Sequence, residues 1–341
     1  MLLKELTEAM GPSGFETEIR EIIRKYATAR VDKAYTDVLG SLIVEKNTAA
    51  AGPRVMLDAH MDEVALMIVH VEDNGLLRFR PIGGVDPRVL VSKPVLIGDK
   101  RIYGVIGAKP IHLQEPSERR EPLGFKQLFV DIGAKDKADA LESVQLGDVA
   151  MFTTRYGEMG DNCAKGKSFD DRVGCGVLLE VLEDSYDLPL FGSFSVQEEV
   201  GLRGATVTAH RIQPDIAIAL EGTICLDVVD APGHGQGTLM GKGPAFTVLD
   251  GNTIANKEFL DFMVAVAEKN DIPYQFRRVK GGSNDFGIIH QTRNGVVGGA
   301  ISVPVRYIHA PAQVISLDDY HNAIRLVKVL LREIAAKSWQ H

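Results

Sequence analysis

Two kinds of sequence pattern divide this chain and restrict the folds open to it. Up to about residue 68, and again from 161 to 341, apolar runs of strand length alternate with helical patterns. From 69 to 160 the apolar runs are short, lie close together and are separated by Gly, Pro and Asp. The first pattern is typical of α/β proteins, in which helices cover both faces of a sheet. The second predicts a small β-barrel or sandwich, which we expect to be a domain inserted into the first.

The expected elements follow from these patterns. In the insertion we expect a helix at 134–144 and strands at 76–79, 94–97, 102–106, 128–132 and 149–152. In the flanking blocks we expect strands at 54–59, 190–196, 215–220, 275–279 and 296–303. Helices are expected there at 2–10, 16–30, 172–182, 257–269 and 316–336.

The stretch 195–202 places two adjacent carboxylates at the end of an apolar strand. Glu198 and Glu199 follow the apolar run 190–196, and Gly201 comes shortly after them. Ligands and chemistry in α/β proteins collect where strands end. Two neighbouring acids there repel each other unless a cation neutralises them or one of them holds a proton. We therefore expect one Glu to bind a metal ion and the other to transfer protons, and the stretch itself leaves open which does which.

Other strand ends supply further side chains that bind metals. His60 with Asp62, Glu221 and His309 stand at three more strand ends, and Asp170 stands at a helix start. Such ends converge on one edge of a doubly wound sheet. Imidazoles mixed with carboxylates suit Zn²⁺, Co²⁺ or Mn²⁺ better than Mg²⁺ or Ca²⁺, which prefer oxygen ligands alone. Two cations need a shared carboxylate with further ligands on each side, and this set is sufficient for that.

Taken in their order along the chain, these motifs resemble those of the M42 family of metallo-aminopeptidases, the tetrahedral and glutamyl aminopeptidases. The resemblance covers nearly the whole chain. It implies a catalytic domain of the zinc-peptidase type at 1–68 and 161–341, with a central mixed sheet and helices on both faces. It also implies a PDZ-like β-barrel at 69–160 that mediates oligomerisation. The matching motifs are Leu57-Asp-Ala-His60-Met-Asp62-Glu63, Ser168-Phe-Asp170-Asp171-Arg172, Ser195-Val-Gln-Glu198-Glu199-Val-Gly-Leu202, Ile218-Ala-Leu-Glu221, Gly281-Gly-Ser-Asn284 and Arg306-Tyr-Ile-His309.

The resemblance implies a set of metal ligands. Asp170 would bridge two divalent ions, which would be zinc, cobalt or manganese. His60 and Glu221 would complete one site, and Glu199 and His309 would complete the other. Many members of the family carry Asp at the position of Glu221, but the longer Glu side chain can still reach a metal ion.

The resemblance also implies the catalytic residues. Glu198 would be the general base that activates a water bridging the two metal ions, and Asp62 would orient His60, as ligand imidazoles generally require. The choice of Asp170 over its neighbour Asp171 as the bridging ligand rests on the family alone.

The activity implied by the resemblance is removal of N-terminal residues from short peptides. The alternatives are a related metal amidohydrolase, such as an N-acyl amino acid deacylase, and an endoglucanase, a label that some proteins of this family have carried. A glycosidase would need two carboxyl groups flanking a sugar and would not need two His ligands. A non-catalytic scaffold would lack a ligand or the base, and none is missing here. The insertion is implied to assemble the chain into dimers and a hollow tetrahedral dodecamer.

The preference for particular substrate side chains stays open. A glutamyl or aspartyl preference would require a basic group near the pocket, and the candidates by sequence are Arg203, Arg278, Lys280 and Arg306. The turn 281–284 is either a tight loop or an element that positions substrate.

Composition limits the partners and the compartment. The 38 Lys and Arg against 46 Asp and Glu give a net charge of −8 without basic clusters, which argues against nucleic acid and anionic membranes as partners. Apolar runs are too short for a membrane helix, and the N-terminus does not read as a signal peptide. Three unevenly spaced cysteines, Cys163, Cys175 and Cys225, indicate a reducing, cytoplasmic setting.

Overall fold

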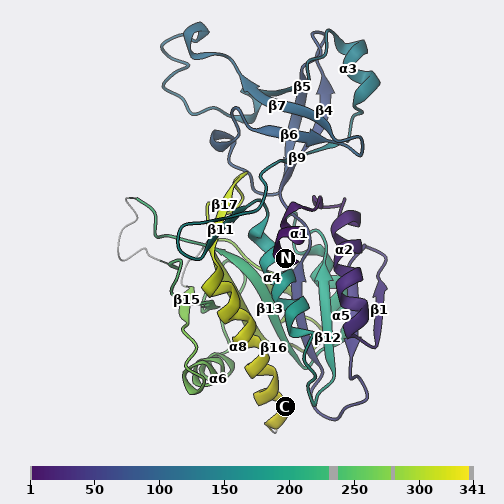
Figure 1. Ribbon diagram of the computed structural model, residues 1–341, viewed down its shortest axis with the longest axis vertical. Coiled ribbons are helices and arrows are strands. Elements are labelled where there is room, and N and C mark those ends of the chain that lie inside the picture. Colours follow the sequence, from purple (N-terminus) through teal and green to yellow (C-terminus); the bar gives the residue numbers. More distant parts are fainter. Residues whose placement is uncertain (1, 230–236, 278–280, 338–341) are drawn as a thin grey trace.

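The computed structural model describes residues 2–229, 237–277 and 281–337. Figure 1 shows two bodies along the long axis of the molecule: a sheet flanked by helices, and a β-barrel above it. The barrel begins shortly after strand β3 (Val55–His60), and the chain later returns to complete the large sheet. The expected α/β fold with an inserted β-barrel is confirmed.

The large sheet has 11 strands and is mixed. Its central strands β12 (Leu190–Ser195), β3, β13 (Ile216–Ile224) and β16 (Val297–Arg306) run parallel, and the pairs that continue the strand order on either side of them are antiparallel. The strand order is β1 (Lys33–Thr36), β2 (Leu42–Lys46), β12 (Leu190–Ser195), β3, β13 (Ile216–Ile224), β16 (Val297–Arg306), β17 (Gln313–Ser316), β11 (Cys163–Gly166) and β10 (Gly157–Met159), with β14 (Ala245–Thr247) joining β16 to β15 (Gln275–Arg277). The strand expected at 275–279 is seen as far as Arg277, because 278–280 lie outside the described residues.

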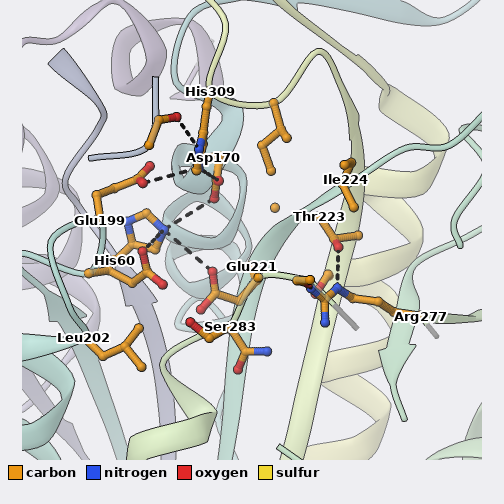
Figure 2. A pocket seen from close by; sticks show the side chains of 18 of the residues that line it. His60, Asp170, Glu199, Leu202, Glu221, Thr223, Ile224, Arg277, Ser283 and His309 are labelled. Carbon is orange, nitrogen blue, oxygen red and sulfur yellow. Dashed lines mark hydrogen bonds and ion pairs between the residues drawn. The ribbon is translucent and has the colours of Figure 1, made fainter. Parts of the chain in front are cut away.

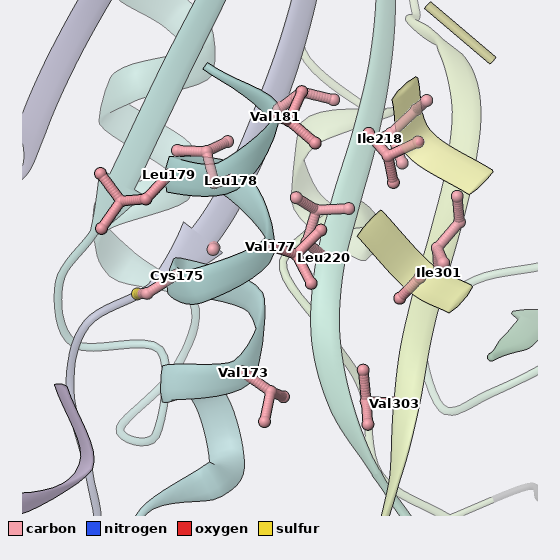
Figure 3. Packing of buried hydrophobic residues seen from close by; sticks show 14 of the residues in the cluster. Val173, Cys175, Val177, Leu178, Leu179, Val181, Ile218, Leu220, Ile301 and Val303 are labelled. Atoms are coloured by element: carbon pink, nitrogen blue, oxygen red, sulfur yellow. The ribbon is translucent and has the colours of Figure 1, made fainter. Parts of the chain in front are cut away.

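Helices cover both faces of this sheet because successive side chains of its strands point to opposite sides. Ile218 and Leu220 of β13 pack in one hydrophobic cluster, whereas Ala217 and Ala219 pack in another. Figure 3 shows the first cluster, with Val177 beside Leu220. The first face carries α1 (Leu2–Glu8), α2 (Thr17–Ala27), α4 (Phe169–Val181), α6 (Lys257–Lys269) and α8 (Leu317–Ala336), and the second carries α5 (Arg203–Ile212) and α7 (Phe286–Ile289).

The remaining helical segments are short. The helix expected at 16–30 is divided into α2 and a 3₁₀ turn, η1 (Thr28–Arg30). The other 3₁₀ turns are η2 (Pro87–Val89), η3 (Ile111–Leu113) and η4 (Phe125–Gln127). Within the described parts of the chain, no helix has both the length and the apolar character to cross a membrane.

The barrel is closed, so each of its strands has two neighbours. Its strands in order around the barrel are β4 (Ala65–Val71), β5 (Leu77–Ile82), β8 (Leu128–Asp131), β7 (Ile102–Ala108), β6 (Pro94–Ile97) and β9 (Val149–Phe152), and α3 (Lys137–Ser143) packs beside them. These strands span 65–152, whereas the insertion was expected at 69–160. Leu66 and Ile68 already belong to the barrel core, and β10 pairs in the large sheet. The barrel strands therefore both start and end earlier in the chain than the boundaries expected from the sequence.

A buried ion cluster fixes the segment after β3 against the start of α4. The carboxylate of Glu63 accepts hydrogen bonds from Lys167 Nζ at 2.6 and 2.7 Å and from Arg172 Nη2 at 3.1 Å. Arg172 Nε also donates to the carbonyl of Met61 at 2.9 Å. Because Met61 follows His60 directly, these bonds hold the end of β3 beside the first turn of α4, where Asp170 lies.

Candidate metal centre and active site

The five predicted metal ligands come together at the carboxyl ends of the parallel strands. Parallel strands end at the same edge of a sheet, so residues far apart in the sequence face one pocket there. Figure 2 shows them around that pocket. They are His60 at the end of β3, Asp170 at the start of α4, Glu199 after β12, Glu221 on β13 and His309 after β16.

The ligands form two groups that share one residue. His60, Asp170 and Glu221 form one group, and Asp170, Glu199 and His309 form the other, each compact enough to hold a metal ion. His60 Nε2 lies 3.4 Å from Asp170 Oδ1 and 3.7 Å from Glu221 Oε2. His309 Nε2 lies 3.2 Å from Asp170 Oδ2 and 3.3 Å from Glu199 Oε2. The two oxygens of Asp170 therefore face different histidines, which is the arrangement that a bridging carboxylate needs.

Asp171 points elsewhere. Its Oδ1 accepts a hydrogen bond from the backbone amide of Gly174 at 3.0 Å, within the first turn of α4. The backbone angles of Asp170 and Asp171 are both non-helical, so the two neighbouring side chains leave the chain in different directions. The geometry thus favours Asp170 as the shared ligand, an assignment that the sequence alone could not make.

Glu198 lines the same pocket beside the two groups. Its Oε2 lies 3.9 Å from His60 Nε2, farther than the carboxylates of either group lie from their histidines. Burial raises the pKa of Glu198 to about 8, although His60 opposes this shift. A carboxylate that is close to the centre and can exchange a proton near neutral pH has the properties of a general base.

Carboxylate groups surround both histidines of the site. Burial alone would lower the pKa of His60, but Glu198 and Asp170 raise it well above its ordinary value. Burial likewise opposes charge on His309, yet Asp170 and Glu199 raise its pKa to about 9. The carboxylates around both imidazoles therefore favour positive charge at this site.

The carboxylates show the same excess of negative charge. Burial raises the pKa of Glu199 and of Glu221 well above the ordinary value for Glu. Glu199 Oε1 is buried and has no hydrogen-bond partner within the described parts of the chain. Buried carboxylates that lack partners are costly unless a cation or a proton compensates them. The donor set of two imidazoles and three carboxylates therefore fits two divalent ions.

Asp62 holds the loop that carries the two glutamates. Its Oδ1 accepts from the backbone amide of Glu198 at 2.9 Å, and its Oδ2 accepts from that of Glu199 at 3.2 Å. Its contact with His60 is made mainly by its backbone carbonyl, 3.1 Å from Nδ1, whereas Oδ1 lies 3.5 Å from Nδ1. Asp62 is thus beside His60 as expected, and it also positions the Glu198–Glu199 backbone, a role that the sequence did not indicate.

Ser13 is a site residue that sequence reasoning missed. Its hydroxyl donates to Asp62 Oδ2 at 2.6 Å, and both side chains are buried. Burial alone would raise the pKa of Asp62, but hydrogen bonds from His60, Ser13 and the amide of Glu198 hold it below its ordinary value. The only signal in the sequence is the Gly- and Pro-rich segment 11–14, which separates the helices expected at 2–10 and 16–30 and carries no mark of a link to the site.

Besides the candidate ligands, both apolar and polar residues line the pocket, whose volume is about 540 Å³. They include the apolar Leu202, Ile224 and Ile308 and the polar Thr223, Arg277 and Asn284. The turn 281–284 lines this pocket, as one of its two interpretations required.

The basic candidates named from the sequence have other places. Arg203 donates to Gln197, and Arg306 forms a two-bond ion pair with Asp227. Arg278 and Lys280 lie outside the described residues. Arg277, which the sequence did not single out, lines the pocket and donates to Thr223 Oγ1 at 2.9 Å, with Asp250 3.3 Å from its Nη1.

Paired histidine and carboxylate groups at the carboxyl ends of parallel strands, within a mixed sheet, define a class of protein that could hold metal ions there. The family model described as M42 glutamyl aminopeptidase matches residues 40–326, and a model described as AMPT matches residues 1–23. The chain therefore belongs to the M42 aminopeptidase family and is a peptide hydrolase.

Individual relatives agree with this assignment. A putative aminopeptidase of Acetivibrio thermocellus is 38% identical over 328 residues, which are 96% of either chain. The solved TET1 peptidase of Pyrococcus horikoshii, which can assemble into a tetrahedron or a large octahedral shell, is 34% identical with a TM-score of 0.87 and covers 97% of this chain and 98% of its own. A Thermotoga maritima structure described as an endoglucanase is 36% identical with a TM-score of 0.82, covering 98% and 99%. The endoglucanase name belongs to that neighbour, whereas the family is one of peptidases.

Proposed function

We propose that this chain is a metal-dependent aminopeptidase that removes N-terminal residues from short peptides with the help of two divalent ions. The observation that carries the proposal is the position of Asp170 between two ligand groups, each completed by one His and one Glu. His60 and Glu221 hold the first ion, and His309 and Glu199 hold the second. Zinc and cobalt suit these ligands best, and manganese is compatible with them.

When bound, such a pair of ions lowers the pKa of water and polarises the carbonyl of the scissile bond. Glu198 is the general base: its carboxylate accepts the proton of the attacking water and then passes that proton to the leaving amine. Asp62 keeps Glu198 in place through the bond to its backbone amide, 2.9 Å long. A nearby cation stabilises the charged carboxylate, so metal binding would lower the pKa of Glu198 from about 8 and make it available as a base.

The excess of acid in the pocket also supports cleavage at the N-terminus of a peptide. A free α-amine is cationic at neutral pH, and the carboxylates around the two ions can attract it. An internal peptide bond has no such charge next to it. The related amidohydrolase reaction on N-acyl amino acids lacks this amine, so a comparison of free and N-acetylated substrates separates the two activities.

Assembly and location form the rest of the proposal. The relative that forms tetrahedral or octahedral shells supports a homo-oligomer, from dimers up to a tetrahedral dodecamer, with the barrel as the assembly domain. Such a shell would admit short peptides and exclude folded proteins. Three free cysteines, of which Cys175 and Cys225 are buried, support a reducing cytoplasmic location.

The variant Glu198→Gln tests the assigned mechanism. We expect it to bind two equivalents of Co²⁺ like the wild type, while kcat for an aminoacyl chromogenic substrate falls by about 100-fold or more, since a general base contributes roughly 10²–10⁴-fold. The control is Glu258→Gln on the exposed surface of α6, which should retain full activity.

Two further measurements decide the class of reaction. A chelator should abolish release of the chromophore, and release of reducing sugar from cellulose should stay at background with or without Co²⁺. Full activity of Glu198→Gln with metal bound would overturn the role of Glu198, and preferred cleavage of N-acetylated substrates would point to the deacylase instead.

A further inference from the structure

The barrel reaches into the candidate metal centre with one turn. Gly83 and Gly84 follow the barrel strand β5 and precede η2. The carbonyl of Gly84 accepts a hydrogen bond from His309 Nδ1 at 2.8 Å, although the two residues are 225 positions apart. The inserted domain therefore touches a candidate ligand directly, through its backbone.

This bond decides which nitrogen of His309 faces the site. A ring nitrogen that donates to a carbonyl carries the proton, so the other nitrogen is left with its lone pair for a metal ion. In His309 that other nitrogen is Nε2, which lies 3.2 Å from Asp170 Oδ2 and 3.3 Å from Glu199 Oε2. Figure 2 shows His309, Asp170 and Glu199 facing one another in this way.

The two glycines also bring the turn close to the ligands. A Cβ on Gly84 would lie 3.2 Å from His309 Nδ1, which is closer than nearly all real Cβ contacts. A Cβ on Gly83 would lie 3.2 Å from Glu199 Cβ and 3.3 Å from Glu199 Oε2, and Gly83 has a φ of +77°. Both candidate ligands that belong only to the second group are thus packed against the same turn.

The first group is held differently. The His60 side chain is 1% exposed, and its Nδ1 contacts the carbonyl of Asp62 inside the catalytic domain. The His309 side chain is 34% exposed and stands on a loop residue with a φ of +59°. His60 is fixed by the core, whereas His309 Nδ1 has the barrel turn as its hydrogen-bond partner, on the ring nitrogen that does not face Asp170 and Glu199.

We propose that the Gly83–Gly84 turn of the barrel is a positioning element for the second metal ion, which sets the affinity of the His309–Glu199 half while leaving the His60–Glu221 half unchanged. This inference rests on the proposed two-ion centre. It gives the inserted domain a role in the active site in addition to assembly. A shift of the barrel relative to the sheet would move the turn and would weaken one ion site selectively.

The variant Gly84→Ala tests this role in the full-length chain. The metal-free protein is titrated with Co²⁺ by calorimetry, and the two binding steps are compared with those of the wild type. Loss of an outer partner of a ligand commonly costs about 10–100-fold in metal affinity. We expect the Co²⁺ affinity of one binding step to fall by this factor. The affinity of the other step should stay within about twofold of the wild-type value. The matched control is Gly124→Ala, also in the barrel, where an added Cβ would meet only Gln127 Oε1 at 3.7 Å.

A second measurement uses the wild-type protein, in case Gly84→Ala disturbs the fold of the barrel. Coupling is reciprocal, so an ion in the His309 half must stabilise the turn that positions it. Amide hydrogen exchange in the segment 83–90 should be slower in the protein with two equivalents of Co²⁺ bound than in the metal-free protein, while Gly124 and its neighbours keep their exchange rates.

The outcomes separate this inference from the proposed function. Two ions bound with wild-type affinities by folded Gly84→Ala would overturn the positioning role and leave the two-ion centre intact. Equal exchange in 83–90 with two equivalents of Co²⁺ bound and without metal would do the same. Failure of the wild type to bind two Co²⁺ ions would overturn both.

Discussion

Asp62 is the single residue whose replacement should separate loop positioning from metal ligation. In the proposed centre Asp62 is not a metal ligand. Its carboxylate accepts hydrogen bonds from the backbone amides of Glu198 and Glu199 and from the Ser13 hydroxyl. The bond with Ser13, at 2.6 Å, joins the N-terminal turn to this loop.

We therefore expect Asp62→Asn to lower kcat substantially. An amide group offers one acceptor oxygen in place of two, so one of the two backbone amides would meet an NH₂ group instead of an acceptor. Loss of a hydrogen-bond partner that orients the metal-site residues should lower kcat or metal affinity by about 10–100-fold, with little change in KM. Steady-state kinetics and Co²⁺ titration measure both.

The control for this change is Asp32→Asn. The carboxylate of Asp32 also accepts a hydrogen bond from a backbone amide, that of Asn47 at 2.6 Å, but this bond is exposed to solvent. If both variants lost activity equally, the effect of Asp62→Asn would reflect general stability and not the position of the glutamates.

At the scale of elements, the turn 11–14 and α2 introduce a buried acid next to the site. Glu16, which precedes α2, is 3% exposed, and its Oε1 accepts from the amide of Gly14 at 2.6 Å. Burial raises its pKa from 4.5 to about 7, and the nearby Asp62 acts in the same direction. The folded protein therefore prefers Glu16 protonated.

This shift predicts a pH-dependent gain in stability for Glu16→Gln. A raised folded-state pKa means that stability is fully present below pH 4.5 and falls as pH rises to about 7. Above that range the ionised Glu16 costs up to about 3 kcal/mol, at roughly 1.4 kcal/mol per pKa unit. Gln keeps the acceptor for Gly14 and never ionises. Urea denaturation should thus show a more stable variant at about pH 8 and little difference below about pH 5.

Glu21→Gln on the exposed side of α2 serves as the control and should change stability little at either pH. An equal gain for Glu16→Gln at both pH values would mean that packing, and not ionisation, is responsible.

Elements also show where sequence patterns mislead. The boundary expected at residue 68 falls inside β4, so its first residues were assigned to the catalytic domain. Its inward side chains, Leu66 and Ile68, belong to the barrel core, and only residues 61–64 separate β4 from β3 of the large sheet. Composition changes gradually across such a junction, whereas pairing with β5 and β9 changes abruptly.

At the scale of the whole molecule, the barrel exposes large apolar side chains that an assembly would cover. Tyr103 on β7 is 72% exposed, and Ile111 on η3 is 67% exposed. Burial of such groups is a common source of association energy. We expect the wild type to sediment as a homo-oligomer at micromolar concentration, up to the proposed dodecamer.

The double variant Tyr103→Lys, Ile111→Lys should sediment as smaller particles, because charge on exposed positions is tolerated by the fold but opposed by an apolar interface. Analytical ultracentrifugation of both proteins measures this. A wild type that sediments only as a monomer would contradict the proposed assembly.

The sequence by itself determined which residues could form the centre. The sequence patterns placed each candidate ligand at an expected strand or helix end, although β13 continues past Glu221 to Ile224. The order of the motifs led to the M42 family, so His60, Glu199, Glu221 and His309 could be named without coordinates. Strand ends are local features, and the edge where they meet follows from the parallel sheet.

Only the tertiary structure decided how these groups face one another. The different partners of Asp170 and Asp171, the bond from Ser13 to Asp62 and the carbonyl of Gly84 at His309 depend on side-chain direction and on packing between distant segments. The periodicity of apolar residues does not predict side-chain direction or packing between distant segments. It indicates which face of an element is apolar, and not which atom of another domain lies against that face.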